Sequence, residues 1–347
     1  MEDEIVLTDD QQKALEMLKN KSLNPFLLKG YAGTGKTTLI TSLLGTLDPQ
    51  QLSKICLTAP TNKAVRVIEK KVREAKFWGV TCKTIHSLLG LKLVYERDKQ
   101  VLRQDRMKSN QMGEYDILVI DECSMVNEQL FKYIMASRKE NPDTRIIYIG
   151  DPRQLPPVHE LDSPTFGTKH QFTLTEVVRQ AAENPMIKLS MQLREAMESG
   201  ENIKLETNTS GVLGVIVEPY EDVCETMFSI YDDAEKKKDP DLCRFLAWTN
   251  RRVDRENREI RRYFLGFDYT IDPPPFLPNE TIVTTAPVIR NKIIVITTDT
   301  EKKILRVEED TRKGVPVWKL VVPADDWQME NVIHIYVIKE EGEKVYQ

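Results

Sequence analysis

The first half of the chain alternates short apolar runs with longer segments whose apolar residues recur at helical spacing. From about residue 5 to residue 180, each apolar run leads into a polar turn that contains glycine or proline. This alternation is typical of an open, mostly parallel sheet covered by helices on both faces, so it predicts an α/β fold. The predicted strands are 26–28, 55–58, 117–120 and 146–149. Because ligands of such sheets bind beyond the carboxyl ends of strands, we expect the following turns to converge on one site.

The pattern changes in the second half. A charged loop at 232–241 precedes a further predicted strand at 243–248. After the prolines at 273–275, short β-rich runs are separated by polar segments, at 280–286, 292–296, 303–307, 315–322 and 332–338. Such runs predict a small β-barrel rather than more α/β layers. Near the middle of the first half, the apolar and charged pattern of 91–102 predicts a small hairpin outside the main sheet.

Composition narrows the class of protein. The chain has 347 residues, of which 40% are hydrophobic and 30% charged, and a net charge of −5. No apolar stretch approaches the roughly 18 residues that span a bilayer, and the acidic start Met1-Glu2-Asp3-Glu4 is unlike a secretion signal, so we expect a cytoplasmic protein without a membrane partner. The five cysteines are widely separated and form no Cys-x-x-Cys pair, which argues against disulfides and zinc. The negative charge implies that any nucleic-acid contact is local.

The turn after the first predicted strand carries a phosphate-binding sequence. Glycines let the backbone curl so that its N–H groups point at phosphate oxygens, and a helix N-terminus follows. Lys36 would pair with phosphate charge, and Thr37 would bind Mg²⁺. The predicted nucleotide-binding residues are Gly30, Ala32, Gly33, Thr34, Gly35, Lys36, Thr37 and Thr38.

Two later turns supply candidate catalytic groups. Asp121 and Glu122 follow the predicted strand 117–120, where Asp121 fits magnesium binding and Glu122 fits activation of an attacking water. Gln154 lies in the turn 150–157, where a neutral side chain could sense the γ-phosphate and prolines stiffen the loop. Alone, an acidic pair is commonly a solvated turn and a proline turn is commonly structural. Beside the phosphate-binding sequence, they indicate hydrolysis of a nucleoside triphosphate.

In chain order, the motifs resemble those of the superfamily 1 DNA helicases, in the RecD-like branch that moves 5′ to 3′. The matching segments are 7–11, 30–37, 59–64, 84–88, 120–125, 150–157, 174–179 and 247–250. The resemblance implies a helicase or translocase that hydrolyses ATP with Mg²⁺ and acts on single-stranded DNA and duplex junctions. It also implies a RecA-like domain at 1–175 with a pin-like insertion at about 91–113, part of a second RecA-like domain at 176–272, and an SH3-like β-barrel at 273–347.

The resemblance also implies residue roles. Gln11 would contact adenine, and Arg179 would be an arginine finger on the γ-phosphate, although a surface salt bridge is the alternative for Arg179. A single-stranded DNA track would include Pro60, Thr61, Asn62, Thr84, His86, Trp248, Thr249 and Asn250. Hydroxyl, amide and backbone N–H groups bind phosphates without reading sequence. His86 could equally be a structural hydrogen-bonding residue. Trp248 could stack on bases, but its apolar neighbours favour core packing.

The chain departs from the family pattern in its last part. Neither of the last two family motifs is found after Asn250, and Thr311-Arg312 is expected in a polar turn rather than in the final motif. The predicted hairpin has a charged tip, Arg97-Asp98-Lys99, without an aromatic wedge. We therefore expect a chain that is C-terminally incomplete, either as a piece of a longer protein or as the product of a shortened gene.

Three functions follow as alternatives. The first is a helicase, monomeric in a bacterial or phage-infected cell, with replication or recombination proteins as further partners. The second is a shortened motor remnant that binds ATP and single-stranded DNA without productive unwinding. The third is a small-molecule kinase, which would leave the turns 59–62 and 150–157 without a purpose.

Overall fold

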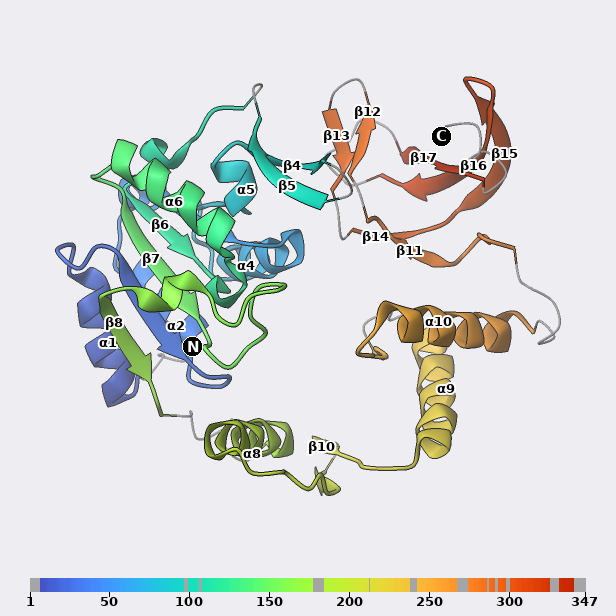
Figure 1. Ribbon diagram of the computed structural model, residues 1–347, viewed down its shortest axis with the longest axis horizontal. Coiled ribbons are helices and arrows are strands. Elements are labelled where there is room, and N and C mark those ends of the chain that lie inside the picture. Colours follow the sequence, from blue (N-terminus) through green and yellow to red (C-terminus); the bar gives the residue numbers. More distant parts are fainter. Residues whose placement is uncertain are drawn as a thin grey trace. The chain divides into compact units, whose positions relative to one another are not determined.

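The computed structural model describes residues 7–96, 99–105, 108–176, 184–211, 213–237, 242–266, 274–285, 287–290, 293–297, 300–324 and 331–339. The chain divides into two compact units, Met1–Val215 and Ile216–Gln347. Figure 1 shows the elements of both units in sequence colours. In the part of the chain that the structure describes, no helix is long and apolar enough to cross a membrane.

A six-stranded sheet forms the centre of the first unit, with the order β3-β2-β6-β7-β1-β8 and parallel pairing throughout. The predicted α/β fold is therefore confirmed. Figure 1 labels β6, β7 and β8 of this sheet. The strands are β1 (Phe26–Gly30), β2 (Ile55–Ala59), β3 (Thr81–Thr84), β6 (Ile117–Ile120), β7 (Arg145–Gly150) and β8 (His170–Leu174). The sequence predicted the inner four, whereas the edge strands β3 and β8 are only partly buried and lack a continuous apolar run.

Helices cover both faces of this sheet because successive strand residues point to opposite sides. Leu27 packs with α5 and α6 in one core, whereas Phe26 and Leu28 pack with α1 and α2 in the other. The helices of this unit are α1 (Asp9–Lys19), α2 (Lys36–Leu44), α3 (Pro49–Leu52), α4 (Asn62–Glu74), α5 (Ile85–Leu88), α6 (Glu128–Glu140) and α8 (Pro185–Ser199). Short 3-10 turns are η1 (Met112–Glu114), η2 (Cys123–Met125) and η3 (Pro164–Gly167).

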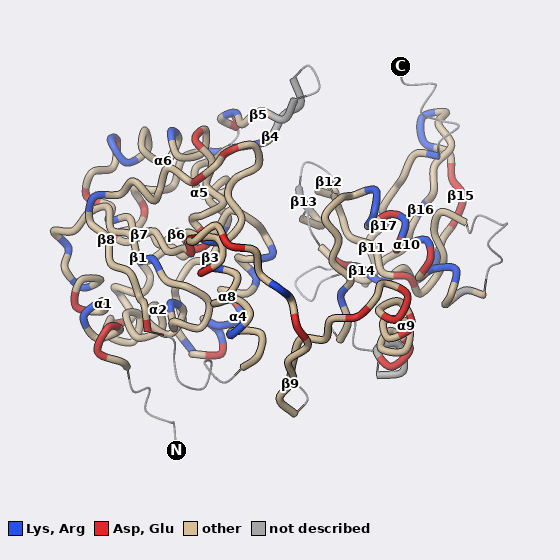
Figure 2. Tube along the Cα trace, turned by 60° about the horizontal axis from the view of Figure 1, so that its bottom comes forward, with Lys and Arg blue, Asp and Glu red and all other residues tan. Residues whose placement is uncertain are grey.

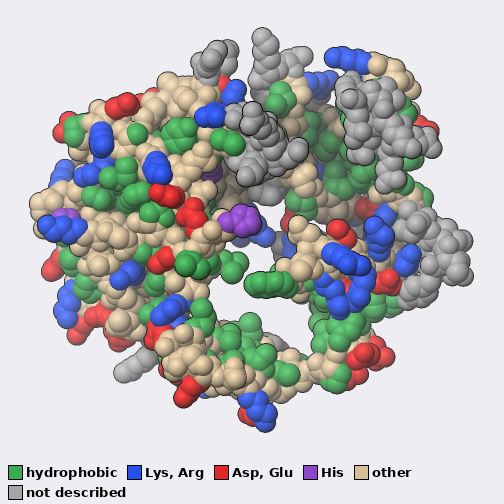
Figure 3. Space-filling view, in the orientation of Figure 1, with side chains coloured by type: hydrophobic (Ala, Val, Ile, Leu, Met, Phe, Trp, Pro, Cys, Tyr) green, Lys and Arg blue, Asp and Glu red, His purple; other side chains and the backbone are tan. Residues whose placement is uncertain are grey.

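Two hairpins extend from the first unit. β4 (Leu91–Glu96) pairs antiparallel with β5 (Lys99–Gln104), so the predicted hairpin is present, and Leu102 anchors its base in the core at 3% exposure. Arg97 and Asp98 at its tip lie outside the described residues. A shorter hairpin, β9 (Asn208–Ser210) with β10 (Leu213–Val215), follows α8. Met186, Leu193 and Met197 of α8 are exposed. Figure 3 shows hydrophobic side chains on the surface where α8 lies in the same view of Figure 1.

The second unit contains α9 (Tyr220–Lys237), α10 (Asn250–Leu265) and small antiparallel sheets. The strands are β11 (Thr281–Val283), β12 (Val288–Arg290), β13 (Ile293–Ile296), β14 (Glu301–Lys303), β15 (Arg306–Arg312), β16 (Val315–Pro323) and β17 (Val332–Ile338). β15, β16 and β17 form one sheet, and β11 pairs with β14 as β12 pairs with β13. Their core includes Ile304, Leu320 and Val322. Small antiparallel sheets are thus present as expected, and a closed SH3-like barrel remains a prediction.

Four local predictions for this unit were wrong. Residues 243–248 form no strand, and Trp248 is 95% exposed, so Trp248 does not pack in the core. Its apolar neighbour Leu246 is also exposed, whereas Cys243 and Phe245, which contact Tyr231 of α9, are half-buried. The run 303–307 is divided between β14 and β15, and Thr311 and Arg312 end β15 rather than forming its turn, which falls at Lys313-Gly314.

The core of the parallel sheet should carry much of the stability of the first unit. Leu118 in β6 is 1% exposed, whereas Leu161 in a surface loop is fully exposed. We expect Leu118→Ala to lower the free energy of unfolding by about 2–5 kcal/mol, because it leaves a cavity in a packed core. Leu161→Ala should change it by less than about 0.5 kcal/mol. Urea denaturation followed by circular dichroism measures both, and equal effects of the two changes would contradict this assignment of the core.

Candidate active site

The turns after three neighbouring strands meet at one edge of the parallel sheet. β6, β7 and β1 are adjacent in that order, and parallel strands place their carboxyl ends together. The phosphate-binding sequence follows β1, Asp121 and Glu122 follow β6, and Asp151 follows β7. The register pairs Lys29 with Gly150, which sets the end of β1 beside the end of β7. Three of the four predicted turns therefore converge, and the turn after β2 lies next to them because β2 pairs with β6.

The phosphate-binding turn has the backbone shape that its glycines permit. Gly33 and Gly35 both have a φ of 80°, in the left-handed region that favours glycine. Gly35 is the N-cap of α2, and no side chain caps that helix start. A Cβ at Gly35 would lie 2.2 Å from Nε2 of Gln11. The first N–H groups of α2 are thus left for another acceptor, which is the arrangement that binds phosphate.

Lys36 is held by its own loop. Its Nζ donates hydrogen bonds to the carbonyl oxygens of Gly30 at 2.6 Å and Tyr31 at 3.0 Å. Burial lowers the pKa of Lys36, and the negative charges of Asp151, Asp121 and Glu122 oppose that shift. A phosphate group would have to replace the two carbonyl oxygens as the partner of this ammonium.

A cavity of about 200 Å³ lies between α2, α4 and the sheet. Its walls are apolar, and its polar end is formed by Lys36, Thr37, Lys71, Asp121 and Glu122. We call it the α2–α4 cavity. It places Thr37 and both carboxylates around one space, although Thr37 belongs to α2 and the two carboxylates follow β6. Mg²⁺ prefers oxygen ligands and keeps several positions for phosphate and water.

The residues present fit a magnesium ion. The hydroxyl of Thr37 and the carboxylate of Asp121 are oxygen donors that line the same cavity. Within the described ranges, no group of three or more His, Cys, Asp or Glu residues could hold a metal by itself. A metal here would therefore depend on phosphate oxygens as additional ligands, as in other phosphate-binding loops.

The acidic pair has a constrained backbone. Glu122 has a φ of 52°, and its N–H donates to Oδ1 of Asp121 at 2.9 Å. Burial raises the pKa of Asp121, while that hydrogen bond and the charges of Lys36 and Lys71 lower it. The pKa of Glu122 is raised by burial and then by the nearby Asp121. A raised pKa suits a carboxylate that accepts a proton from water.

Buried hydroxyl groups fix the turn behind the acidic pair. Oγ of Ser163 lies 2.9 Å from the carbonyl oxygen of Cys123 and 2.8 Å from that of Val126. Thr165 donates to the same Cys123 carbonyl at 3.2 Å. A Cβ at Gly150 would lie 2.7 Å from Sγ of Cys123, so the glycine lets β7 approach the turn. These contacts hold Asp121 and Glu122 at the edge of the cavity.

Gln11 contacts the phosphate-binding turn directly. It is 3% exposed, and its Nε2 donates to the carbonyl oxygen of Thr34 at 3.0 Å. Its Oε1 accepts from the N–H of Thr8, which completes the capping box at the start of α1. The amide therefore ties the first helix to the phosphate-binding turn, and its predicted contact with adenine remains a prediction.

In the turn after β7, Asp151 is buried beside the site, whereas the predicted residue Gln154 is not. Gln154 is exposed and does not line the α2–α4 cavity. Asp151 is 6% exposed, and its charge acts on both Lys36 and Glu122. Asp151 is not among the predicted site residues, although its position directly after a buried strand matches that of Asp121. Arg179 lies outside the described residues.

The predicted DNA-contacting residues of the first unit lie at two adjacent strand ends. Ala59 at the end of β2 pairs with Thr84 at the end of β3. Thr61 caps α4 by accepting from the N–H of Ala64 at 3.2 Å, and Thr84 caps α5 by accepting from Ser87 at 3.1 Å. The structure thus brings Pro60, Thr61, Asn62, Thr84 and His86 to one end of the sheet.

His86 and the predicted residues of the second unit have different surroundings. Burial lowers the pKa of His86, which favours a neutral imidazole. Thr249 caps α10 by accepting from the N–H of Arg252 at 3.2 Å, and Asn250 is the first residue of that helix. Trp248 precedes them as an exposed ring. These last three residues belong to the second unit and form a separate group.

Comparison with known proteins agrees with this geometry. A family model described as an AAA domain matches residues 6–213. The chain belongs to the AAA domain family. The sequence is 27% identical over 301 residues to the ATP-dependent DNA helicase dda of Enterobacteria phage T4, covering 82% of this chain and 62% of that one. It is 32% identical over 184 residues to the ATP-dependent RecD2 DNA helicase of Deinococcus radiodurans, covering 52% of this chain and 23% of that protein. The resemblance to superfamily 1, RecD-like helicases is thereby confirmed.

Among solved structures, this chain superposes with a TM-score of 0.51 on a structure of two coordinating Pif1 helicases that concerns DNA unwinding at forked duplex DNA. The two chains are 18% identical, and the match covers 96% of this chain and 76% of that one. This likeness shows the fold. The chain spans less than two thirds of the length of the phage T4 helicase and about a quarter of the Deinococcus protein.

The contact of Gln11 with Thr34 predicts an effect on every phosphate-bearing ligand. Gln11→Ala should weaken binding of ATP, GTP and pyrophosphate by a similar factor, about threefold to tenfold, because a buried hydrogen bond to the phosphate-binding turn is lost. Competition against a fluorescent nucleotide measures all three ligands. Gln12→Ala is the matched control, since Gln12 is exposed and donates to Leu7. A loss confined to ATP would instead assign Gln11 to adenine contact.

Proposed function

We propose that the protein is an ATP-driven motor on single-stranded DNA that moves 5′ to 3′ and unwinds duplex junctions. The observation that carries the proposal is that the nucleotide-site residues and the proposed DNA-contacting residues lie at the ends of strands of one sheet. Lys36, Thr37, Asp121 and Glu122 line one end of the α2–α4 cavity, and the helix that forms its other wall begins at Thr61 on the proposed DNA track. A nucleotide site and a DNA contact joined by one helix suit the conversion of hydrolysis into movement.

The chain's own groups would divide the hydrolytic work. Lys36 pairs with phosphate charge, and Glu122 accepts a proton from the attacking water. Thr37 and Asp121 hold Mg²⁺, which when bound neutralises charge on the phosphate oxygens. Gln154 senses the γ-phosphate from the turn after β7. Arg179 adds positive charge to the transition state from a partial second motor domain at 176–272.

The proposed DNA track uses groups that do not read sequence. The threonine hydroxyls at Thr61 and Thr84 cap helices whose N-termini attract phosphate. Positions of basic and acidic residues are interspersed along the backbone of the first unit (Figure 2), so a few local contacts rather than overall charge would hold DNA. Trp248 is exposed, as a base-stacking ring must be, and Thr249 and Asn250 lie beside it.

The direction of movement is proposed from the likeness to RecD-like helicases. The same likeness supports a monomer that acts with replication or recombination proteins in the cytoplasm of a bacterial or phage-infected cell. The two predicted boundaries at 175 and 272, and an SH3-like barrel from 273 onward, belong to this proposal. The alternative is a shortened motor that binds ATP and single-stranded DNA without productive unwinding.

Loss of the phosphate-binding ammonium tests the motor proposal. Lys36→Ala should lower DNA-stimulated ATP hydrolysis on the order of 100-fold, because the charge partner of the phosphates is removed. Lys21→Ala, at an exposed position outside the site, is the control. Phosphate release with and without single-stranded DNA measures the effect. Absence of DNA-stimulated hydrolysis in the unaltered chain would overturn the proposal, whereas hydrolysis without strand separation on a forked duplex would favour the shortened motor.

A charge placed at the start of α4 tests the DNA track. Thr61→Asp keeps a side-chain acceptor for the N-cap, and an acidic residue suits a helix N-terminus, so the fold should be preserved. It should weaken single-stranded DNA binding about tenfold by repelling phosphate. Thr61→Asn keeps the cap without the charge and should bind within about threefold of the unaltered protein. Fluorescence anisotropy with labelled oligonucleotide measures both, and equal affinities for the Asp and Asn variants would remove Thr61 from the track.

A further inference from the structure

Lys71 reaches the proposed metal ligand from a neighbouring helix. It lies in the last turn of α4, and its Nζ donates to Oγ1 of Thr37, in the first turn of α2, at 3.3 Å. Both side chains line the polar end of the α2–α4 cavity together with Asp121 and Glu122. No motif of the sequence analysis includes Lys71.

The ammonium of Lys71 has the charge and position to compete with a metal ion for the hydroxyl of Thr37. A hydroxyl oxygen offers a limited number of lone pairs, so an ammonium that donates to Thr37 occupies the atom that a metal would bind. The positive charge of Lys71 also acts on the carboxylate of Asp121. One exposed side chain thus interacts with both oxygen donors that fit Mg²⁺.

The surroundings of Lys71 allow its side chain to move away from the hydroxyl of Thr37. Its side chain is exposed and can turn into solvent at a small cost. The wall between α2 and α4 is apolar, through Ile40, Val67 and Phe77, and encloses the cavity of about 200 Å³. An interface with unfilled volume has fewer dispersion contacts to lose when one helix shifts against the other. The hydrogen bond from Lys71 to Thr37 therefore connects α4 to α2 across a loosely packed interface.

We propose that Lys71 is a positioning residue that holds the hydroxyl of Thr37 before nucleotide binds and is displaced from it by Mg²⁺. The inference rests on the proposed function, because it assigns the metal to that same site. Displacement releases the last turn of α4 from α2. Thr61 caps α4 and Asn62 is its first residue. Binding of the metal and nucleotide therefore frees one end of the helix whose other end carries part of the proposed DNA track.

The test measures how nucleotide binding depends on Mg²⁺. A fluorescent ADP analogue is held at fixed concentration while Mg²⁺ is titrated into the full chain without DNA, so no hydrolysis is involved. In Lys71→Met, the Mg²⁺ concentration at half-maximal binding should fall about twofold to fivefold, because one exposed competing charge is removed. Lys71→Arg, which keeps the charge, should stay within about twofold of the unaltered protein.

Lys70→Met is the matched control for loss of charge on α4. Lys70 is the preceding residue, is exposed, and pairs with Glu74 at 3.9 Å instead of with the site. Its Mg²⁺ midpoint should equal that of the unaltered chain. An unchanged or higher midpoint in Lys71→Met would overturn the inference, as would an equal shift in both methionine variants. If DNA-stimulated hydrolysis is absent but the Lys71→Met midpoint falls, the motor proposal fails while the role of Lys71 stands.

Discussion

The parallel pairing of β6, β7 and β1 is the constraint on which the nucleotide site depends. Each strand is buried on both faces, so its register is set by packing against two helical layers as well as by backbone hydrogen bonds. Parallel strands deliver their following turns to one edge of the sheet. The phosphate-binding turn, the acidic pair and Asp151 therefore meet without a direct side-chain bond joining all three. β2 and β3 extend the same edge and carry Thr61 and Thr84 to adjacent positions.

The polar groups of the site are satisfied by one another in this structure. Lys36 donates to two carbonyl oxygens of its own turn, Gln11 donates to Thr34, and Lys71 donates to Thr37. Buried polar groups without partners are costly, so such bonds stabilise the chain before a nucleotide binds. A nucleotide with its metal must offer better partners to Lys36 and Thr37. Binding is therefore an exchange of partners, and that exchange links the site to α1 through Gln11 and to α4 through Lys71.

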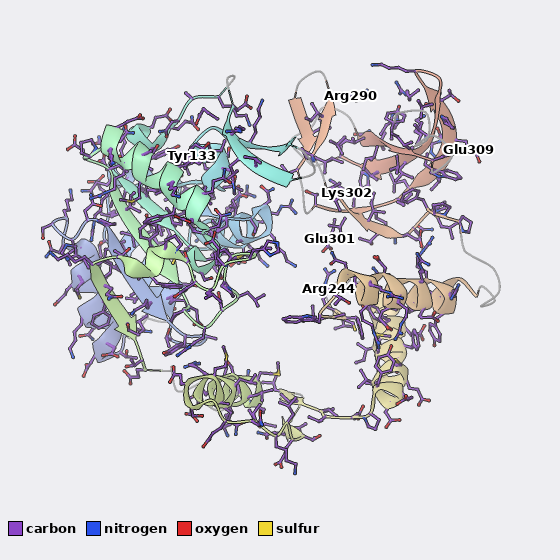
Figure 4. The ribbon with its side chains drawn as sticks, viewed as in Figure 1. Tyr133, Arg244, Arg290, Glu301, Lys302 and Glu309 are labelled. Carbon is purple, nitrogen blue, oxygen red and sulfur yellow. The ribbon has the colours of Figure 1, made fainter. Side chains whose placement is uncertain are left out.

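The second unit uses buried charge to join its helices. Glu256 in α10 is 2% exposed and accepts from Tyr220 of α9 at 2.7 Å and from Arg252 at 2.7 Å. Arg255 also donates to Glu256 at 3.3 Å, so three partners together compensate this buried carboxylate. Arg244 and Glu301 point toward each other in Figure 4 and lie 3.0 Å apart, which connects the segment before α10 to β14. These pairs give the unit specific contacts between helices and strands in addition to the apolar core of its sheets.

The sequence by itself determined the inner strands of the sheet, the phosphate-binding turn and the acidic pair, because their residues follow one another directly and their local pattern is sufficient. Edge strands β3 and β8 were missed, since a half-buried strand has no long apolar run. Trp248 was placed in a core on the basis of apolar neighbours, yet exposure depends on what covers a segment and not on its composition. Asp151 and Lys71 were found only in the folded chain. Their distances to Lys36, Glu122 and Thr37 are set by the pairing of strands and the packing of α4 on α2, which no local pattern specifies.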